Sequence, residues 1–298
     1  MSALAVTGAG GFIGTEFVRS TLEARENVVL LGRAELDESL HRRLRGCDTL
    51  VHLAARAHVL DADAAADAKA FERSNVALTQ LVADAACRAG LGRMVFVSSA
   101  GVLGRRSPPG GFHDHSRPAP HDAYTRSKLA AEEMLMGHYA TRIEVVIVRP
   151  PLVYGPNAPG NFGRLLRLVR RGWPLPFGAL DAPRSMIGLR NLCDALRHAA
   201  AHPHASGLRM LVADRESPSV AGLLTECATA MGRPARLLSI PYSVLEMAFR
   251  VIGRESDFER LTAPFQLHPV VAVERLGWTP PWSFEEELRW AIGATEWR

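Results

Sequence analysis

The sequence has 298 residues, of which 47% are apolar and 22% charged, and its formal net charge is +4. This composition excludes a disordered chain and a disulfide-stapled mini-protein, and the length suits one large domain or two small ones. Because the positive charge is spread in pieces no longer than an Arg-Arg pair, we expect a small anionic substrate and no nucleic-acid partner.

Short apolar runs alternate with amphipathic stretches through the first half of the chain. We predict helices over residues 14–24, 74–89 and 124–139, and buried strands over residues 4–6, 28–31, 49–53, 94–98 and 145–149. This alternation predicts an α/β fold, a Rossmann-type doubly wound parallel sheet. Only residues 34–48 separate the second strand from the next, so the third strand of a Rossmann sheet is predicted to be missing and the second to lie at the edge.

The second half has a different rhythm. Residues 150–183 are rich in proline and glycine, and helices are predicted over 219–231 and 244–252. We expect a dinucleotide-binding Rossmann domain over 1–155 and about 185–205, and a smaller, mostly helical substrate domain over 156–184 and 206–298. With no bilayer-spanning stretch, no leader and four widely spaced cysteines, we predict a cytoplasmic protein without a metal site or a membrane partner.

A glycine-rich loop follows the first strand and opens the first helix. Gly8 permits a tight turn, Gly11 lets the backbone approach a pyrophosphate, and Gly14 lets helix pack on sheet. With Gly10, Phe12 and Ile13 they form the predicted cofactor-binding loop. Arg33 follows the second strand, where NAD-binding proteins carry Asp or Glu, so it favours the 2′-phosphate of NADP without excluding NAD; the other interpretation is a surface arginine.

Tyr124 and Lys128 lie four residues apart and therefore on one face of the predicted helix. A free phenol is a weak base at neutral pH, and a neighbouring ammonium group stabilises its phenolate. Ser98 and Ser99 come at the carboxyl end of the fourth strand, where open α/β sheets bind ligands. We predict that Ser99, Tyr124 and Lys128 form a catalytic set.

Together these motifs resemble the extended short-chain dehydrogenase/reductase superfamily, in its NAD-dependent epimerase/dehydratase family. The resemblance rests on the glycine loop and on residues 51–55 (VHLAA), 98–104 (SSAGVLG), 124–128 (YTRSK), 149–156 (RPPLVYGP) and 276–280 (LGWTP). It makes Tyr124 the acid/base, Lys128 its partner on the nicotinamide ribose, and Ser99 the hydroxyl that polarises the sugar oxygen. It further implies cofactor contacts at Leu53, Ala54, Ala55, Pro150, Tyr124 and Lys128, with Asn75 supporting the site.

The same resemblance implies a nucleotide-sugar site and a homodimer. Its substrate-binding residues are Ser99, Asn161, Leu175, Phe177, Arg184 and Arg260, of which the arginines suit a diphosphate. The homodimer is built on the helices over 74–89 and 124–139. Arg190 stands where the family often has Asp, so the attachment of the second domain is expected to differ. His113, His115 and His121 are interpreted as loop residues.

The implied activity is hydride transfer at carbon 4 of a UDP-linked hexose, for surface polysaccharide sugars. Ala100 and Gly101 replace the Asp-Glu pair of the family's dehydratases, so we do not expect dehydration. A 4-keto sugar nucleotide reductase using NADPH and a 4-epimerase using NAD both remain open, and Arg33 tips the balance slightly to the reductase. The alternatives are a reductase of a small non-nucleotide ketone and a non-catalytic NADP-sensing regulator.

Overall fold

The computed structural model describes residues 3–56 and 64–295, with the side chains of residues 64–67 and 161 outside that description. Its centre is a sheet of six parallel strands in the order β2-β1-β3-β4-β6-β9. The strands are β1 (Ala3–Thr7), β2 (Asn27–Leu31), β3 (Thr49–His52), β4 (Arg93–Val97), β6 (Glu144–Arg149) and β9 (Arg209–Leu211). Central strand β4 is buried at every residue, which is why it forms a continuous apolar run in the sequence.

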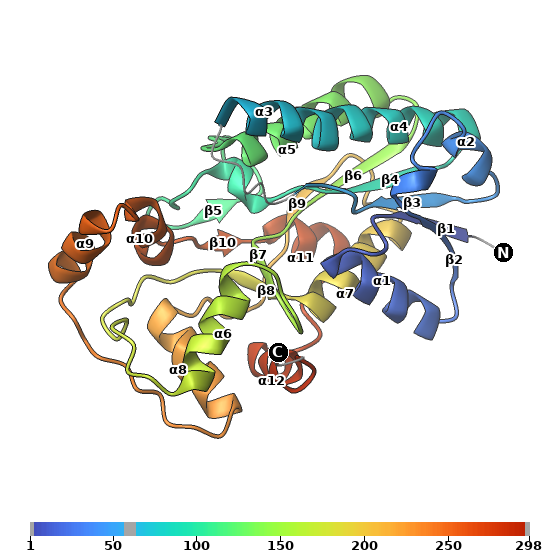
Figure 1. The fold of residues 1–298 in the computed structure, drawn as a ribbon. Helices are drawn as coiled ribbons and strands as arrows, with labels where there is room; N and C mark the ends of the chain where they lie inside the picture. Colours follow the sequence, from blue (N-terminus) through green and yellow to red (C-terminus); the bar gives the residue numbers. More distant parts are fainter. Residues whose placement is uncertain (1–2, 57–63, 296–298) are drawn as a thin grey trace.

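Helices cover both faces of this sheet (Figure 1). The first face packs against α1 (Phe12–Glu23), α7 (Leu189–Ala201) and α11 (Val270–Leu276) in one apolar core. The second face packs against α2 (Leu40–Arg43), α4 (Leu78–Ala89) and α5 (Ala123–Met134), with α3 (Ala64–Phe71) beside α5. Two π-helical turns, η2 (Glu72–Ala77) and η4 (Leu135–Tyr139), precede α4 and follow α5. The doubly wound parallel fold is thus confirmed.

The edges of the sheet bear out one prediction and correct another. Strand β2 is an edge strand, and only the 3₁₀ turn η1 (Arg33–Glu35) and α2 lie between it and β3, so the described chain has no third Rossmann strand there. At the other edge, β9 pairs with β6, although it falls within residues 206–298, which we assigned to the smaller domain. That assignment is wrong for β9, because three residues are too short a run to identify as a strand. Helix α11, from the same range, also packs on the large sheet, and the rest of the division stays a prediction.

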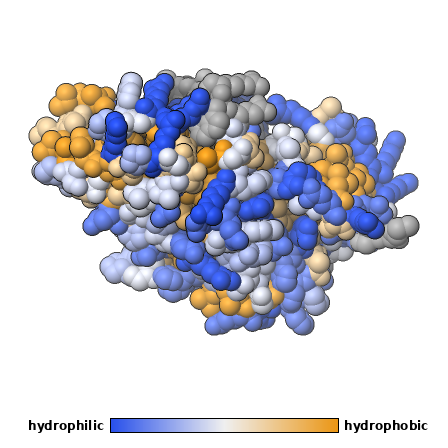
Figure 2. All heavy atoms as spheres, turned by 90° about the horizontal axis from the view of Figure 1, so that it is seen from below, coloured by the Kyte–Doolittle hydropathy of each residue, from blue (hydrophilic) through white to orange (hydrophobic). Residues whose placement is uncertain are grey.

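The smaller part of the molecule is mostly helical and has its own apolar core. It contains α6 (Asn161–Arg171), α8 (Val220–Ala230), α9 (Tyr242–Val251), α10 (Glu255–Thr262) and α12 (Phe284–Gly293). Two short parallel pairs, β7 (Leu152–Tyr154) with β8 (Met186–Gly188) and β5 (Phe112–His113) with β10 (Leu267–His268), connect it to the large sheet. Figure 2 shows this part from below, with apolar side chains gathered at the end where α9 lies.

No helix in the described ranges is long and apolar enough to cross a bilayer. All four cysteines are free thiols, and no three His, Cys, Asp or Glu side chains of residues 3–56 and 64–295 gather as a metal-binding group.

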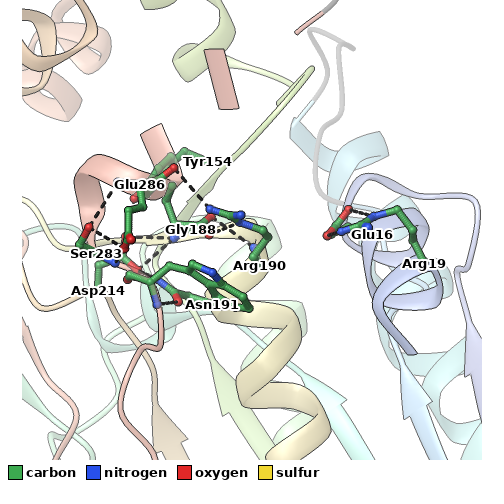
Figure 3. Close-up of polar contacts among 11 residues, drawn as sticks. Glu16, Arg19, Tyr154, Gly188, Arg190, Asn191, Asp214, Ser283 and Glu286 are labelled. Atoms are coloured by element: carbon green, nitrogen blue, oxygen red, sulfur yellow. Dashed lines mark hydrogen bonds and ion pairs between the residues drawn. The ribbon is translucent and has the colours of Figure 1, made fainter. Parts of the chain in front are cut away.

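A buried carboxylate, Asp214, joins the two parts (Figure 3). Its oxygens accept hydrogen bonds from the Tyr154 hydroxyl at 2.7 Å and the Asn191 amide at 2.8 Å. The backbone N–H of Gly188 also donates to both oxygens. Burial raises the pKa of Asp214 to about 6, although these hydrogen bonds lower it. Strands β7 and β8, helix α7 and the chain after β9 therefore meet at one side chain.

Arg190 attaches the last helix to this junction. Its Nε donates to the fully buried Glu287 carboxylate of α12 at 2.6 Å, and its guanidinium lies over the rings of Trp282 and Trp290. Burial raises the pKa of Glu287 to about 7, and the contact with Arg190 lowers it. Arg190, which replaces the expected Asp, thus attaches α12 to the large part through one ion pair and two ring contacts, so the attachment differs as expected.

Replacing Tyr154 by Phe should lower the free energy of unfolding by about 1–3 kcal/mol, because it leaves a buried carboxylate short of a donor. Urea denaturation measures this loss. The matched control is Tyr139→Phe, since the Tyr139 hydroxyl also donates to an aspartate, Asp84 at 2.9 Å, but that carboxylate is partly exposed. Equal losses in the two variants would contradict a special role for Asp214.

Candidate active site

A cleft of about 940 Å³ opens at the carboxyl ends of the central strands, between the large sheet and the smaller part. The predicted residues that line it are Gly8, Gly11, Phe12, Ile13, Gly14, Leu53, Ala55, Ser99, Tyr124, Lys128, Pro150, Arg184 and Arg260. The structure therefore brings together, on one wall or another, the glycine loop, the proposed catalytic set and the two arginines.

The glycine loop is shaped by contacts that side chains would block. Gly8 has φ +73°, and a Cβ there would lie 2.6 Å from the backbone nitrogen of Ala54. A Cβ on Gly14 would lie 2.1 Å from the carbonyl oxygen of Gly8. Helix α1 starts directly after Gly11 with no side-chain cap and no acidic residue in its first turn. Its first amides are thus available to an anion such as a pyrophosphate.

The cleft also contains an unpartnered polar atom. The Ser98 hydroxyl lies on the cleft wall, buried, and makes no hydrogen bond within the described part of the chain. Buried hydroxyls normally have partners, so this one is suited to a polar group of a bound molecule. Together with the open loop amides, it makes the cleft fit a dinucleotide.

Helix α5 presents Tyr124 and Lys128 to the cleft. A capping box between Asp122 and Thr125 fixes the start of the helix at Ala123, which places Tyr124 in its first turn. Burial and the Asp122 carboxylate raise the pKa of Tyr124 to about 12, and a hydrogen bond with the Ser99 hydroxyl lowers it by less. In this arrangement the phenol is protonated at neutral pH.

Lys128 is almost fully buried beneath the cleft. Its Nζ donates to the Val97 carbonyl at 2.8 Å and lies 4.7 Å from the centre of the Phe96 ring. Burial lowers its pKa to about 7, although Glu132 acts in the opposite direction. Functional sites often contain residues with strongly shifted pKa values, and a cleft lysine with a pKa of about 7 fits this pattern.

Ser99 caps the 3₁₀ turn η3 (Ala100–Leu103) at the end of β4. Its Oγ accepts a hydrogen bond from the backbone N–H of Gly101 at 3.1 Å. A Cβ on Gly101 would lie 2.9 Å from a methyl group of Thr125, so this turn packs directly on the start of α5. Ser99 and Tyr124 are therefore held in place by contacting elements.

A chain of buried hydrogen bonds links the glycine loop to η2. The Thr7 hydroxyl lies 2.6 Å from His52 Nδ1, and His52 Nε2 lies 3.0 Å from the Thr79 hydroxyl. Because Thr79 donates its one proton to the Asn75 carbonyl at 2.6 Å, His52 must donate through Nε2 and accept from Thr7 through Nδ1. Burial lowers the pKa of His52 to about 3, so the ring stays neutral, as this pattern requires.

Asn75 carries the same chain of hydrogen bonds onward to α5. Its side-chain amide donates to the Ser127 hydroxyl at 2.9 Å, and Ser127 donates to the Tyr124 carbonyl at 2.8 Å. Its oxygen accepts from the backbone N–H of Arg56 at 2.9 Å. Asn75 does not line the cleft but positions α5 and the segment after β3, which is consistent with the supporting role expected for it.

Arg184 is a cation without an ionic partner in the described residues. One of its terminal nitrogens donates to the Ala263 carbonyl, its side chain is half-buried on the cleft wall, and no carboxylate of those residues forms an ion pair with it. Burial lowers the pKa of its guanidinium. Arg260 is exposed, lines the cleft from α10 and lies 3.9 Å from Asp257. Both arginines are placed to bind an anion.

Several predicted residues do not line the cleft. Ala54 contacts Gly8 instead, and Gly10 and Arg33 are exposed, Arg33 at the end of β2. Leu175 and Phe177 pack in the core of the smaller part. The sequence does not distinguish an apolar residue that fills a core from one that contacts the base of a nucleotide. Asn161 begins α6, but its side chain lies outside the described residues.

The cleft also contains residues that the sequence did not single out for binding. Arg105, His121 and Arg126 line it, and Arg105 forms an ion pair with Glu259 of α10 at 2.6 Å. His121 Nδ1 is buried without a partner in the described chain, and burial lowers the pKa of its ring. Arg105 directly follows the motif over residues 98–104, and Arg126 lies within the motif over residues 124–128; this proximity in sequence could have identified both.

Glu35 lies in η1 at the end of β2 and was not among the predicted site residues. A Cβ on Gly32 would lie 2.8 Å from a carboxylate oxygen of Glu35, so this carboxylate occupies the position of the missing side chain at the end of β2. An acidic residue at that place suits the ribose hydroxyls of NAD.

Comparison with known proteins agrees with this geometry. UDP-glucose 4-epimerase from Vibrio cholerae is 32% identical over 96% of this chain and 93% of its own. N-acetyl-alpha-D-glucosaminyl-diphospho-ditrans,octacis-undecaprenol 4-epimerase from Escherichia coli O157:H7 is 25% identical over 79% of this chain and 74% of its own. The solved structure of MoeE5 in complex with UDP-glucose and NAD superposes with a TM-score of 0.79, at 26% identity and 98% coverage of both chains.

A family model describes most of the chain as well. Residues 4–212 match the model of the NAD dependent epimerase/dehydratase family. This range contains the glycine loop, Ser99, Tyr124, Lys128 and Arg184, all of which line the cleft. The chain therefore belongs to the NAD dependent epimerase/dehydratase family, as the resemblance of its motifs predicted, and is an enzyme.

Proposed function

We propose that this enzyme transfers a hydride at carbon 4 of a UDP-linked hexose and works as a UDP-hexose 4-epimerase. The observation that carries the proposal is the half-buried guanidinium of Arg184, which has no carboxylate partner in the described residues and shares one cleft with Ser99, Tyr124 and Lys128. A diphosphate would supply its missing counter-charge. Both relatives named above are 4-epimerases whose named substrates contain a sugar attached through a diphosphate, which supports this choice.

The three side chains have separate roles in the proposed reaction. Tyr124 removes the proton from the hydroxyl on carbon 4 while the hydride leaves that carbon, and Ser99 holds the same oxygen. The reaction in this direction starts from the phenolate form of Tyr124, which the ammonium group of Lys128 stabilises, and the phenolate becomes a phenol as it takes the proton. NAD, held by the glycine loop, supplies the hydride acceptor. The resulting 4-keto sugar turns over, and return of hydride and proton to its other face gives the epimer.

A 4-keto sugar nucleotide reductase is the second candidate. Arg33 favours it, because an exposed guanidinium at the end of β2 suits the 2′-phosphate of NADPH. Glu35 favours NAD and therefore the epimerase, since its carboxylate lies at the same strand end. In the reductase, the protonated phenol of Tyr124 would donate its proton to the carbonyl oxygen as hydride arrives.

The deciding experiment identifies the cofactor released when the purified protein is denatured and then assays interconversion of UDP-glucose and UDP-galactose. We expect NAD at about one per chain and interconversion without added cofactor. An empty site that prefers NADPH, with NADPH oxidation by a UDP-4-keto sugar, would replace the epimerase by the reductase. Turnover of simple ketones alone would overturn both.

Replacing Arg184 by Met should raise KM for the UDP-sugar about 10- to 100-fold, because it removes a charge-assisted contact to the diphosphate. Cofactor binding should stay unchanged. Initial-rate kinetics and cofactor titration measure the two effects. Arg289→Met is the control, since Arg289 lies on α12 and pairs with Glu285. An unchanged KM in Arg184→Met would remove Arg184 from the substrate site.

We also propose a homodimer formed through α4 and α5. These helices lie side by side on the outer face of the large part, which supports a four-helix contact between two copies (Figure 1). Light scattering should give twice the chain mass, and a monomer at assay concentration would refute the proposal.

A further inference from the structure

Helix α9 is apolar on the side that faces solvent as well as on the side that faces the protein. Leu245 is buried and Phe249 packs against the core of the smaller part. On the outer side, the exposed fraction is 56% for Val244, 57% for Met247 and 78% for Val251. A surface helix usually has one apolar stripe, and the opposite side is polar. The outer side of α9 therefore needs a physical explanation.

The exposed apolar residues continue beyond the middle of the helix. Tyr242 at its start and Ile252 just after its end are 48% and 61% exposed. We call these five residues, Tyr242, Val244, Met247, Val251 and Ile252, the α9 surface. Figure 1 shows that α9 lies at the far end of the molecule, and Figure 2 shows apolar side chains gathered at that end. The α9 surface thus lies at a protruding end of the molecule, where a membrane surface could contact it.

The chain around the α9 surface is basic. Residues 231–254 contain four arginines, Arg233, Arg236, Arg250 and Arg254, and one acidic residue, Glu246. All four arginines are exposed; Arg250 lies 3.8 Å from Glu246 and Arg254 pairs with Asp257 of α10, whereas Arg233 and Arg236 form no ion pair in the described residues. Apolar side chains bordered by arginines are typical of helices that lie in the headgroup region of an anionic membrane.

The α9 surface is connected to the active site through α10. The ring of Phe258 on α10 packs against Tyr242 at 4.8 Å and Phe249 at 5.4 Å between ring centres. Two residues further along α10, Arg260 lines the cleft. A partner that binds α9 would consequently lie near the entrance used by an anionic substrate.

We propose that the α9 surface docks this enzyme on a membrane surface that contains anionic lipids. The apolar side chains enter the headgroup layer, and Arg233 and Arg236, which form no ion pair in the described residues, contact the lipid phosphates. A two-fold contact with a second copy fits less well, because it would set the same arginines against each other. A stable protein interface also uses about 20–30 residues a side, far more than this surface offers. The sequence predicted no membrane partner because it has no membrane-spanning segment. Docking on a membrane surface does not require such a segment.

The test measures cosedimentation of the full-length protein with vesicles of phosphatidylglycerol and phosphatidylcholine, and with vesicles of phosphatidylcholine alone. We expect binding to the anionic vesicles that weakens as salt rises. The double variant Val244→Gln, Met247→Gln should bind them at least about tenfold more weakly, because two apolar side chains no longer enter the layer. None of these residues lines the cleft, so the test is independent of the proposed function.

The matched control is the double variant Val270→Gln, Val273→Gln. These valines have the same three-residue spacing on α11 and are 39% and 45% exposed. We expect this variant to bind vesicles as the unchanged protein does, with thermal unfolding verifying that both variants fold. The proposal is overturned if the protein does not bind anionic vesicles, if both variants bind equally, or if the α9 variant instead loses self-association measured by light scattering.

Discussion

Replacing Tyr124 by Phe should lower kcat by about two to four orders of magnitude, the usual contribution of a positioned acid/base. The variant keeps the ring and its packing against Phe71 but loses the proton that moves to and from the sugar oxygen. Because phenylalanine keeps the ring in place and leaves the glycine loop untouched, the Kd for the cofactor should change by less than about threefold. Stopped assays with purified UDP-sugar and cofactor titration measure both quantities.

The pH dependence gives a second readout of the same group. Burial and Asp122 hold the pKa of Tyr124 at about 12, so the base form is scarce at pH 7 and grows as pH rises. Up to about pH 7, where Lys128 still carries its charge, the rate of sugar oxidation in the unchanged enzyme should therefore rise with pH, and in Tyr124→Phe this rise should be absent. Tyr139→Phe is the control tyrosine outside the cleft. A Tyr124→Phe enzyme with full activity would exclude acid/base chemistry at this residue.

The large sheet could be predicted because its strands are covered on both faces. The central strands must then be apolar at successive residues, and such runs stand out between amphipathic helices. The same argument found the missing third strand, since residues 34–48 leave no room for it. Strands β9, β5 and β10 have only two or three residues each, and their pairing depends on contacts between distant parts of the chain. Local sequence patterns do not contain that information.

The two halves of the cleft differ in how far the sequence describes them. The glycine loop and the Tyr124–Lys128 pair are local motifs whose spacing alone brings the atoms together. The other wall draws Arg105, Arg184 and Arg260 from three separate segments, in a chain with many arginines. Leu175 and Phe177 show the limit most plainly, because an apolar residue that contacts a ligand and one that fills a core have the same chemistry.

Replacing Lys128 by Met should abolish most activity and yet raise the free energy of unfolding at pH 6 by about 2–4 kcal/mol. Lys128 is 3% exposed, and burial lowers its pKa from 10.5 to about 7. Each pKa unit corresponds to about 1.4 kcal/mol, so holding the charged form inside the protein costs several kcal/mol. Loss of the hydrogen bond to Val97 offsets about 1–2 kcal/mol of the gain. Methionine has a similar length and no charge.

The higher free energy of unfolding of Lys128→Met, relative to the unchanged protein, should become smaller as pH rises. Below pH 7, Lys128 is charged in the folded and the unfolded chain, and the full cost of burial is present. Between about pH 7 and 10.5 the folded protein holds the neutral amine while the unfolded chain remains charged, so the cost falls as pH rises. The stability difference between Lys128→Met and the unchanged protein should therefore shrink by about 2–3 kcal/mol from pH 6 to pH 9.

Urea denaturation of the cofactor-free protein at pH 6 and pH 9 measures this change. Lys69→Met is the matched control, because Lys69 is exposed on α3 and is the other lysine of the chain. It should show neither the gain at pH 6 nor the dependence on pH. A difference for Lys128→Met that stays constant from pH 6 to pH 9 would mean that the ammonium group is not strained by burial. The expected result would instead show that burying the Lys128 charge lowers the stability of the protein, at the same residue that the proposed reaction requires.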